Sequence, residues 1–499
     1  MTTTNDIVAR LWNLCHTLRD DGVTYHQYVT ELTYLLFLKM AEETGTEGAI
    51  PAGWRWADLV AKDGTDQLTF YREMLIHLGA EAGGKVQAIY ANANTSLRHP
   101  RNLAKLVTSI DALDWYSART EGLGDLYEGL LEKNANETKS GAGQYFTPRP
   151  LIEAMVEIIK PQAGEIISDP AAGTLGFITR ADRYIKDRTD ELFDLPEAKQ
   201  VYQKREAYYA IELVPETRRL ALMNALLHDI DCEIILGDTL SPTGATVPKS
   251  DVILTNPPFG TKKGGGGPTR DDFTFPTSNK QLAFLQHIYR NLRPGGRAAV
   301  VLPDNVLFED GQGAKIRGDL MDKCDLHTIL RLPTGIFYAQ GVKTNVLFFT
   351  KGAANKDTGN TKAVWVYDLR TNTPSFGKRT PFTRAFLQPF VDAYGDDPKG
   401  SSPRKDEGDE GRFRRFTREQ IKARGDNLDI TWLRDENTDR AEDLPEPDEI
   451  AAQILMHLQT ATEEMQALME LLDPNGSAST GNGAGANGSN GTAPAEAAQ

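Results

Sequence analysis

The stretch EIISDPAAGTLGF, Glu165 to Phe177, decides the fold class of this 499-residue chain. An apolar run typical of a β-strand ends at Asp169, and a turn rich in small residues follows it and opens a helix. Small residues let the backbone N–H groups at a helix start approach a ligand closely, as in other nucleotide-binding turns. The spacing is not GxGxxG, which argues against a dinucleotide pyrophosphate and for a smaller ligand with a carboxylate and one ribose. The candidate binding residues of this turn are Asp169, Ala171, Gly173, Thr174, Leu175 and Gly176.

Two further predicted strands end in acidic residues. YYAIEL, Tyr208 to Leu213, places Glu212 at the carboxyl end of a strand, where its carboxylate can accept both hydroxyls of a ribose. CEIILGDTL, Cys232 to Leu240, is read as a strand ending at Asp238, which is placed to accept a hydrogen from an adenine amino group. Each acid alone is more typical of a helix cap or a turn. Their chain order and βαβ spacing favour one nucleotide-binding edge.

A fourth apolar strand, DVILTNPPFG, ends in Asn256-Pro257-Pro258-Phe259. A planar amine such as N6 of adenine is a poor nucleophile, because its lone pair is delocalised into the ring. The side-chain carbonyl of Asn256 and the backbone carbonyl of Pro257 can each accept one amine hydrogen, which favours a tetrahedral nitrogen aimed at an electrophilic methyl group. The paired prolines fix the turn, and Phe259 gives a base a face to stack on. The plainer alternative is a turn that only ends a strand.

Taken in order, these motifs resemble the S-adenosylmethionine-dependent amino methyltransferases of DNA in which the cofactor half precedes the catalytic half. GAGQYFTPRPLIEAMV, Gly141 to Val156, narrows the resemblance, since it is similar to the extra cofactor-binding motif of the modification subunit of type I restriction-modification systems. By composition alone this segment also suits a domain linker. The resemblance covers roughly residues 1 to 473 and implies that Thr147 lies near the methionyl group of the cofactor. It implies a pocket lined by Gln144, Tyr145, Phe146, Thr147, Pro148 and Arg149.

The resemblance also implies an activity and partners. The expected reaction moves the methyl group of S-adenosylmethionine to N6 of adenine in a specific duplex DNA target, with the adenine flipped out of the helix. The expected partners are a DNA specificity subunit, with two copies of this chain to one specificity chain, and a restriction subunit that carries nuclease and motor activities. The chain itself has no GxxxxGK[ST] loop, and the lone Glu197-Ala198-Lys199 triplet suits a surface linker better than a nuclease site.

Two alternatives to DNA methylation stay open. An Asn-Pro-Pro-aromatic turn also suits methylation of a glutamine side-chain amide or of an RNA amino group, because the hydrogen-bonding problem is the same. The segment from Gln144 to Arg149 and the long helical N-terminus favour DNA. The second alternative is a catalytically silent scaffold that holds a specificity protein on DNA, and the intact motifs speak against it.

The pattern predicts an α/β fold, with a doubly wound, mostly parallel Rossmann-like methyltransferase sheet. An α-helical N-terminal domain precedes the sheet and a C-terminal coiled-coil-type helix follows it. The predicted parts are a helical domain (1–135), the catalytic domain (140–370), a polar irregular extension (371–445), a partner-docking helix (446–473) and a disordered Gly/Ala/Asn/Ser tail (474–499).

The C-terminal helix has a narrow apolar seam with 3,4 spacing, which is typical of helix-to-helix packing. The seam residues are Ala451, Ile454, Leu458, Ala461, Met465, Leu468 and Leu472. This helix packs either on the protein's own N-terminal helices or on the long helices of a specificity subunit. We favour the second, because an acidic chain otherwise lacks a route to a chosen DNA site.

Composition indicates whether the chain spans a membrane, forms disulfides or holds a metal. The chain has 40% apolar residues but no apolar run of ~18 residues, so no membrane span is expected. Three cysteines, Cys15, Cys232 and Cys324, lie far apart, which favours reduced thiols in a cytoplasmic protein and no metal site.

The net charge of −15 predicts weak DNA binding by the chain alone, since affinity for duplexes comes largely from neutralised phosphates. The basic run from Arg412 to Arg424 is more typical of a solvated face than of a DNA contact. The Gly-rich loop Gly260 to Phe273 either closes over the extruded base or only connects two elements.

Overall fold

The computed structural model describes residues 4–18, 22–116, 122–137, 146–259, 267–337, 342–356, 358–374, 376, 380–434 and 462. Gln144 and Tyr145 of the expected cofactor motif lie outside these ranges, as do the expected C-terminal helix over 446–473, apart from Thr462, and the tail over 474–499. Across the described ranges, every helix is too short or too polar to cross a membrane.

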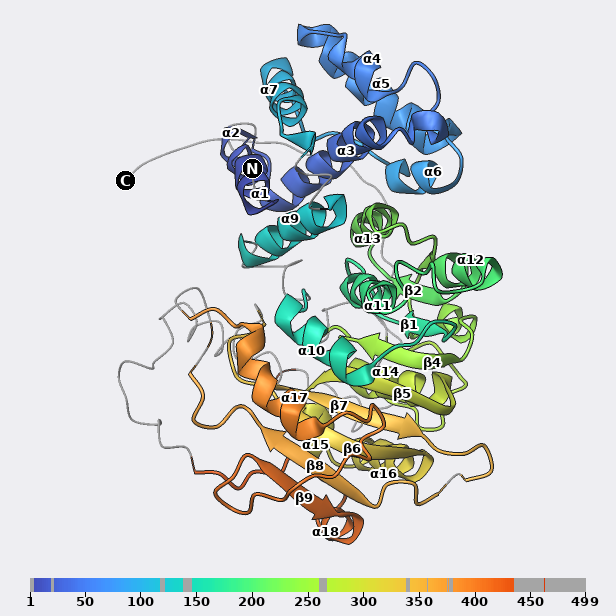
Figure 1. The fold of residues 1–499 in the computed structure, drawn as a ribbon, viewed down its shortest axis with the longest axis vertical. Helices are drawn as coiled ribbons and strands as arrows, with labels where there is room; N and C mark the ends of the chain where they lie inside the picture. The colour runs from blue at the N-terminus through green and yellow to red at the C-terminus, as the bar shows by residue number, and fades with distance from the viewer. Residues whose placement is uncertain are drawn as a thin grey trace, which may run out of the picture.

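Helices alone form the N-terminal part, which stacks on one end of a large sheet (Figure 1). Its longest helix, α3, begins after Thr24, whose side chain and Gln27 form a capping box, and ends at Gly45 in the left-handed conformation with φ 70°. α9 packs on α1, on α3 and on α13 of the sheet-bearing part. The helices are α1 (Thr4–Asn13), α2 (Cys15–Leu18), α3 (Tyr25–Thr44), α4 (Trp56–Val60), α5 (Gly64–Glu81), α6 (Gly84–Tyr90), α7 (Pro100–Asp111) and α9 (Leu123–Glu137).

One nine-stranded sheet forms the rest of the fold, in the order β3-β2-β1-β4-β5-β7-β6-β8-β9. The pairs among β3, β2, β1, β4 and β5 are parallel, so these strands end at one edge of the sheet. β7 runs antiparallel between β5 and β6, and β9 runs antiparallel to β8. The strands are β1 (Ile167–Asp169), β2 (Tyr208–Glu212), β3 (Glu233–Leu236), β4 (Ser250–Thr255), β5 (Leu292–Pro303), β6 (Cys324–Arg331), β7 (Thr344–Lys351), β8 (Ala363–Asp368) and β9 (Phe413–Thr417).

Helices cover both faces of the sheet, as the alternation of buried strand residues requires. Val252 and Leu254 of β4 belong to the same apolar core as α10, α11, α13 and α17, whereas Ile253 packs with α14, α16 and α18. These helices are α10 (Arg149–Ile159), α11 (Gly176–Lys186), α12 (Glu197–Arg205), α13 (Pro215–Leu227), α14 (Lys280–Asn291), α15 (Asn305–Phe308), α16 (Gln312–Lys323), α17 (Gln388–Tyr394) and α18 (Arg418–Ala423). The expected doubly wound α/β fold is thereby confirmed.

Two features differ from the sequence-based expectation. The strand expected to reach Asp238 ends at Leu236, and after Gly237, whose N–H still donates to the carbonyl of Glu212 at 3.0 Å, the chain enters a turn at Asp238. The extension over 371–445 is not irregular throughout, because it supplies α17, β9 and α18, and β9 lengthens the sheet.

Candidate active site

The carboxyl ends of β1, β2 and β4 open into one cavity of about 1310 Å³. It is lined by Asp169 after β1, Glu212 after β2 and Asn256 after β4, together with α9, α11 and α13 residues. A single small-molecule site of ~300–1,000 Å³ would be smaller. The cavity exceeds that range, and it also reaches Phe193, Lys204 and Asp229.

The turn between β1 and α11 forms the floor of this cavity. Gly173 has a φ of +54°, and a Cβ there would meet no atom within 4 Å. Leu175, at the start of α11, also has a positive φ, 76°, although it is fully buried. Left-handed backbone at a residue other than glycine costs free energy and is typical of functional turns. The side chain of Asn224 on α13 holds the turn by donating to the carbonyl of Thr174 at 2.9 Å.

Glycine at position 176 has a packing reason. A Cβ there would lie 2.9 Å from the Cδ1 atom of Ile152 on α10. Gly176 therefore lets α10 and α11 approach closely, so that the residues just before α10 reach the cavity. Ala171 and Thr174 line the same cavity, while Leu175 points into the core.

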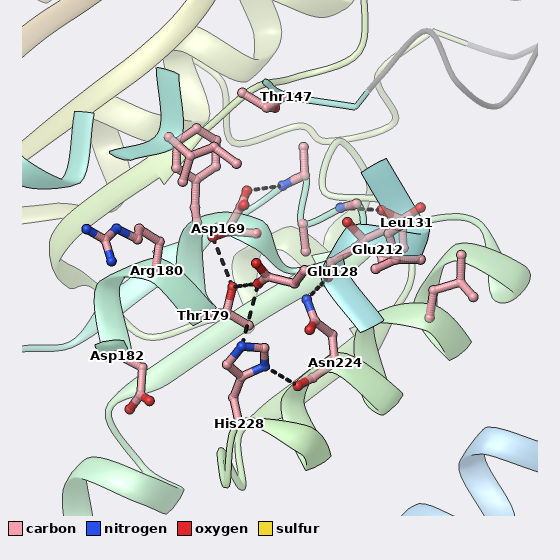
Figure 2. A pocket seen from close by; sticks show the side chains of 18 of the residues that line it. Glu128, Leu131, Thr147, Asp169, Thr179, Arg180, Asp182, Glu212, Asn224 and His228 are labelled. Carbon is pink, nitrogen blue, oxygen red and sulfur yellow. Dashed lines mark hydrogen bonds and ion pairs between the residues drawn. The ribbon is translucent and has the colours of Figure 1, made fainter. Parts of the chain in front are cut away.

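Glu212 lies at the end of β2 with its carboxylate directed at the turn (Figure 2). One oxygen accepts the backbone N–H of Gly173 at 2.9 Å and the other that of Val214 at 2.8 Å. Burial raises the pKa of Glu212 above its usual value, against these hydrogen bonds. The backbone N–H of Leu213 also acts on this carboxylate, whose two oxygens have four acceptor positions, so acceptor capacity remains for a ligand.

Asp169 is 1% exposed, and burial raises the pKa of its carboxyl group to about 7. The backbone N–H of Ala171 donates to its Oδ1 at 3.0 Å, and the nearby Glu212 raises the pKa further. A cationic ligand group beside Asp169 would favour the ionised form and lower this pKa.

Asp238 is exposed at the rim of the cavity, two residues beyond the end of β3. Its Oδ1 accepts the backbone N–H of Leu240 at 2.8 Å, which fixes the turn. The neighbouring Thr239 hydroxyl donates to the carbonyl of Pro170 at 2.5 Å. This bond ties the β3 turn to the β1 turn, so Asp238 and Asp169 line one cavity.

Asn256 follows β4 directly and is 7% exposed. Its Nδ2 donates to the hydroxyl of Thr147 at 2.9 Å. Among the described residues, nothing donates to its buried Oδ1. A buried acceptor without a donor is costly, so this oxygen is an unusual feature that a ligand hydrogen would satisfy.

The rest of the turn after β4 contacts two other elements. Gln281 on α14 approaches the carbonyl of Pro258 with its side-chain N–H at 3.4 Å, and Pro257 is buried. Phe259 meets Phe337 edge to face, with ring centroids 5.5 Å apart. Phe337 lies in the connection after β6, and its role was missed in the sequence because only the fold brings it beside Phe259.

Four residues of the expected cofactor motif are described. Phe146 lines the cavity, Thr147 contacts Asn256, and Pro148 is the N-cap residue of α10. Arg149 lines the cavity too, but its guanidinium group pairs with Glu128 of α9. The structure therefore brings Phe146, Thr147 and Arg149 to the cavity, and gives Arg149 a partner in the helical part.

Glu128 connects the helical part to the cavity, and sequence reasoning missed it. It accepts the hydroxyl of Thr179 on α11 at 2.9 Å and lies 3.7 Å from the ring of His228, which follows α13 (Figure 2). Burial would raise the pKa of Glu128, but the charges of Arg149 and His228 hold it below its usual value. No local pattern around Glu128 predicts this, because its partners lie in three other elements.

The basic run from Arg412 to Arg424 is largely occupied within the protein. Arg412 donates to the backbone carbonyls of Asp368 and Thr371 at 2.7 and 2.8 Å. Arg414 pairs with Asp409, and Arg418 with Asp426. These pairings favour the structural interpretation of the run over a DNA contact.

Comparisons with known proteins agree on one family. The family model described as N-6 DNA Methylase matches residues 118–442. The type I restriction enzyme StySPI methylase subunit of Salmonella potsdam is 54% identical over 94% of this chain and 95% of its own length. The crystal structure of the EcoKI M protein is 49% identical, with a TM-score of 0.57 over 94% of this chain and 98% of that one. A structure from a study of complex assembly and conformational transition of the type I R-M system is 26% identical, with a TM-score of 0.69 over 95% of this chain and all of that one.

Proposed function

The chain belongs to the N-6 DNA methylase family, as a type I methylase subunit and adenine-specific DNA methyltransferase, and from that premise we propose that its cavity holds S-adenosylmethionine beside a flipped adenine. The observation that carries the proposal is the pairing, in one cavity, of a nucleotide-binding turn with the unsatisfied Oδ1 of Asn256. The volume of about 1310 Å³ suits both ligands.

Residues of the β1 and β2 ends would hold the cofactor, which supplies the electrophilic methyl group. The free acceptor positions of Glu212 suit the two ribose hydroxyls, and Gly173 leaves space for the ligand because nothing lies within 4 Å of its Cβ position. Asp169 suits a cationic amino group, since a positive charge beside the buried carboxyl favours its ionised form. Asp238 suits an adenine amino group at the rim.

The motif before α10 would complete the cofactor pocket, as its resemblance to type I modification subunits implies. Phe146 and Arg149 line the cavity from this side, and Gln144 and Tyr145 belong to the same proposal. Ala171, Thr174, Leu175 and Gly176 would shape the turn rather than bind through their side chains, because backbone N–H groups and small size are what such a turn uses.

Asn256 and Pro257 would prepare the target amine for methylation. The Oδ1 of Asn256 accepts one amine hydrogen and the backbone carbonyl of Pro257 the other, which draws the nitrogen lone pair out of the ring plane. Phe259 would stack on the base, with Phe337 fixing its ring edge to face. The extra proton on the methylated amine leaves to solvent, so neither residue has to titrate.

We propose that a separate chain reads the DNA. The net charge of −15 and the internal pairing of Arg412, Arg414 and Arg418 leave this chain poorly equipped to bind a duplex alone. A DNA specificity subunit, with two copies of this chain per copy of it, would supply the target sequence. A restriction subunit would join the full complex in the cytoplasm.

The test is methyl transfer by the chain co-expressed with its native DNA-reading partner. Tritiated S-adenosylmethionine is offered with duplex DNA, with RNA and with a glutamine-bearing protein, and Asn256→Ala is the matched control. We expect label only in duplex adenine and only with the wild-type chain. Label in RNA or protein but not in DNA would overturn the proposed substrate, and equal label with Asn256→Ala would overturn the proposed catalytic turn.

A further inference from the structure

Thr147 and Asn256 are 109 residues apart in the chain, yet their side chains share a buried hydrogen bond of 2.9 Å. Thr147 is 8% exposed and Asn256 is 7% exposed, so water has little access to either group. The bond uses the Nδ2 of Asn256 and leaves the Oδ1 as the atom without a donor. The amide is thus oriented with its donor toward Thr147, and its buried Oδ1 accepts no hydrogen bond from the described residues.

The orientation of an amide matters because its two ends are nearly the same in shape and opposite in function. With Oδ1 available, Asn256 accepts a hydrogen from an amine. With the amide turned by 180°, an N–H group would face the amine, and two donors would oppose each other. Only one of the two orientations therefore suits the reaction proposed above.

The hydroxyl of Thr147 lowers the free-energy cost of the productive orientation, because it accepts a hydrogen bond from the buried Nδ2. Without that hydroxyl, a buried N–H group would lack a partner whenever Oδ1 faced the amine. The amide would then lose the hydrogen bond that holds it in this orientation. A donated hydrogen at Nδ2 also polarises the amide and makes Oδ1 a better acceptor.

The segment that carries Thr147 is itself fixed. Pro148 caps α10, and its carbonyl accepts the backbone N–H groups of Leu151 and Ile152 at 2.9 and 3.1 Å. The next residue, Arg149, is paired with Glu128 of α9. Thr147 therefore directly precedes the fixed start of a helix that is also tied to the helical part, as suits a group that positions another.

We propose that Thr147 is a positioning residue for catalysis, which accepts the Nδ2 hydrogen of Asn256 and so holds the amide in place for the target amine. The inference rests on the proposed function, and it gives Thr147 a task in the catalytic half in addition to the cofactor half that the resemblance implies. It predicts that loss of the hydroxyl lowers turnover far more than it lowers cofactor affinity.

The experiment compares Thr147→Val with Thr147→Ser in the chain purified with its native partner. Valine keeps the shape and removes the hydroxyl, whereas serine keeps the hydroxyl. Thr33→Val is the matched control, since it removes a buried hydroxyl in the helical part that bonds the carbonyl of Val29 at 2.7 Å and the hydroxyl of Tyr127 at 2.9 Å. Single-turnover methyl transfer to duplex DNA gives the rate, and calorimetry gives the affinity for S-adenosylmethionine.

We expect Thr147→Val to lower the single-turnover rate roughly 10- to 100-fold, the range for one unsatisfied buried donor, with cofactor affinity within threefold of wild type. Thr147→Ser should stay within threefold in both measurements, and Thr33→Val should keep the wild-type rate. A Thr147→Val rate within threefold of wild type would overturn the proposal. A parallel loss of cofactor affinity and rate would also overturn it, by making Thr147 a cofactor ligand only. An inactive wild-type complex would instead refute the proposed function, so the two failures are distinguishable.

Discussion

Glu212→Ala tests the proposed ribose contact most directly. In the protein without ligand, the Glu212 carboxylate accepts the N–H groups of Gly173 at 2.9 Å and Val214 at 2.8 Å. Both N–H groups border the cavity, so water can replace the carboxylate after the substitution. Removal of a buried carboxyl whose pKa burial raises also relieves a desolvation cost. We therefore expect the free energy of unfolding to fall by no more than ~1 kcal/mol.

The effect on the cofactor should be larger than the effect on stability. Two ribose hydroxyls would lose a charged acceptor, and a hydrogen bond to a charged group contributes ~1.5–3 kcal/mol, with part of the loss recovered by water. A net loss of ~2–3 kcal/mol corresponds to a dissociation constant raised roughly 30- to 150-fold. Calorimetry with S-adenosylmethionine measures it, and Glu216→Ala is the control, because Glu216 is an exposed acid in the first turn of α13.

A cofactor analogue without the two ribose hydroxyls separates direct contact from displacement of the turn. The wild-type protein should bind this analogue much more weakly than the parent compound. Glu212→Ala should bind the two compounds with similar affinity, because the discriminating acceptor is gone. If the variant still preferred the parent compound by the wild-type ratio, the ribose contact would have to be assigned to another residue.

Four further predictions address the other parts of the site. Asn256→Ala should lower single-turnover methylation ~10²–10³-fold, the cost of one lost transition-state partner, with cofactor affinity within threefold by calorimetry. The affinity of the wild-type protein for the cationic cofactor should rise as the pH increases through about 7, because burial raises the pKa of Asp169 to that value and only the ionised carboxyl attracts the cation. Asp169→Asn should remove this pH dependence. Cofactor titrations of both proteins at pH 6 and pH 8 test the prediction, and the same change of affinity with pH in the two proteins would refute it. Glu128→Ala leaves Arg149 without its buried partner. The unfolding midpoint in urea should therefore fall by an amount equivalent to ~1–3 kcal/mol of unfolding free energy. An unchanged midpoint would mean that the pair contributes nothing to stability. Deletion of residues 447–499 should leave a folded protein that binds cofactor but no longer co-purifies with its partner, and full co-purification would assign the seam to the protein's own core.

Residues that act within one strand and its turn could be predicted from the sequence. Glu212 lies at the end of β2 as expected, because five consecutive residues and the helix signal after them fix both the strand and its end. The turn after Asp169 could be predicted in the same way, since its small residues and the helix that follows them are adjacent in the sequence. The end of β3 was placed two residues too late, because nothing in Leu-Gly-Asp distinguishes the last paired residue from the first residue of the turn.

Residues that act through distant partners could not be predicted in this way. Glu128 reaches Arg149, Thr179 and His228 only because α9 packs against the sheet-bearing part. Thr147 and Asn256 meet only when β4 and the start of α10 are side by side. Neither contact has a spacing in the sequence that distinguishes it from chance.

The antiparallel direction of β7 brings one more aromatic residue to the site, although no clear pattern in the sequence indicates this direction. A mostly parallel sheet was expected, and in such a sheet a crossover would carry the chain after β6 to the opposite edge. Because β7 runs antiparallel to β6, the connection between Arg331 and Thr344 stays at the edge where β4 ends. Phe337 lies in that connection and meets Phe259 at 5.5 Å between ring centroids. The antiparallel strand therefore places a second aromatic side chain beside the catalytic turn, a position that the alternation of apolar residues along β7 does not reveal.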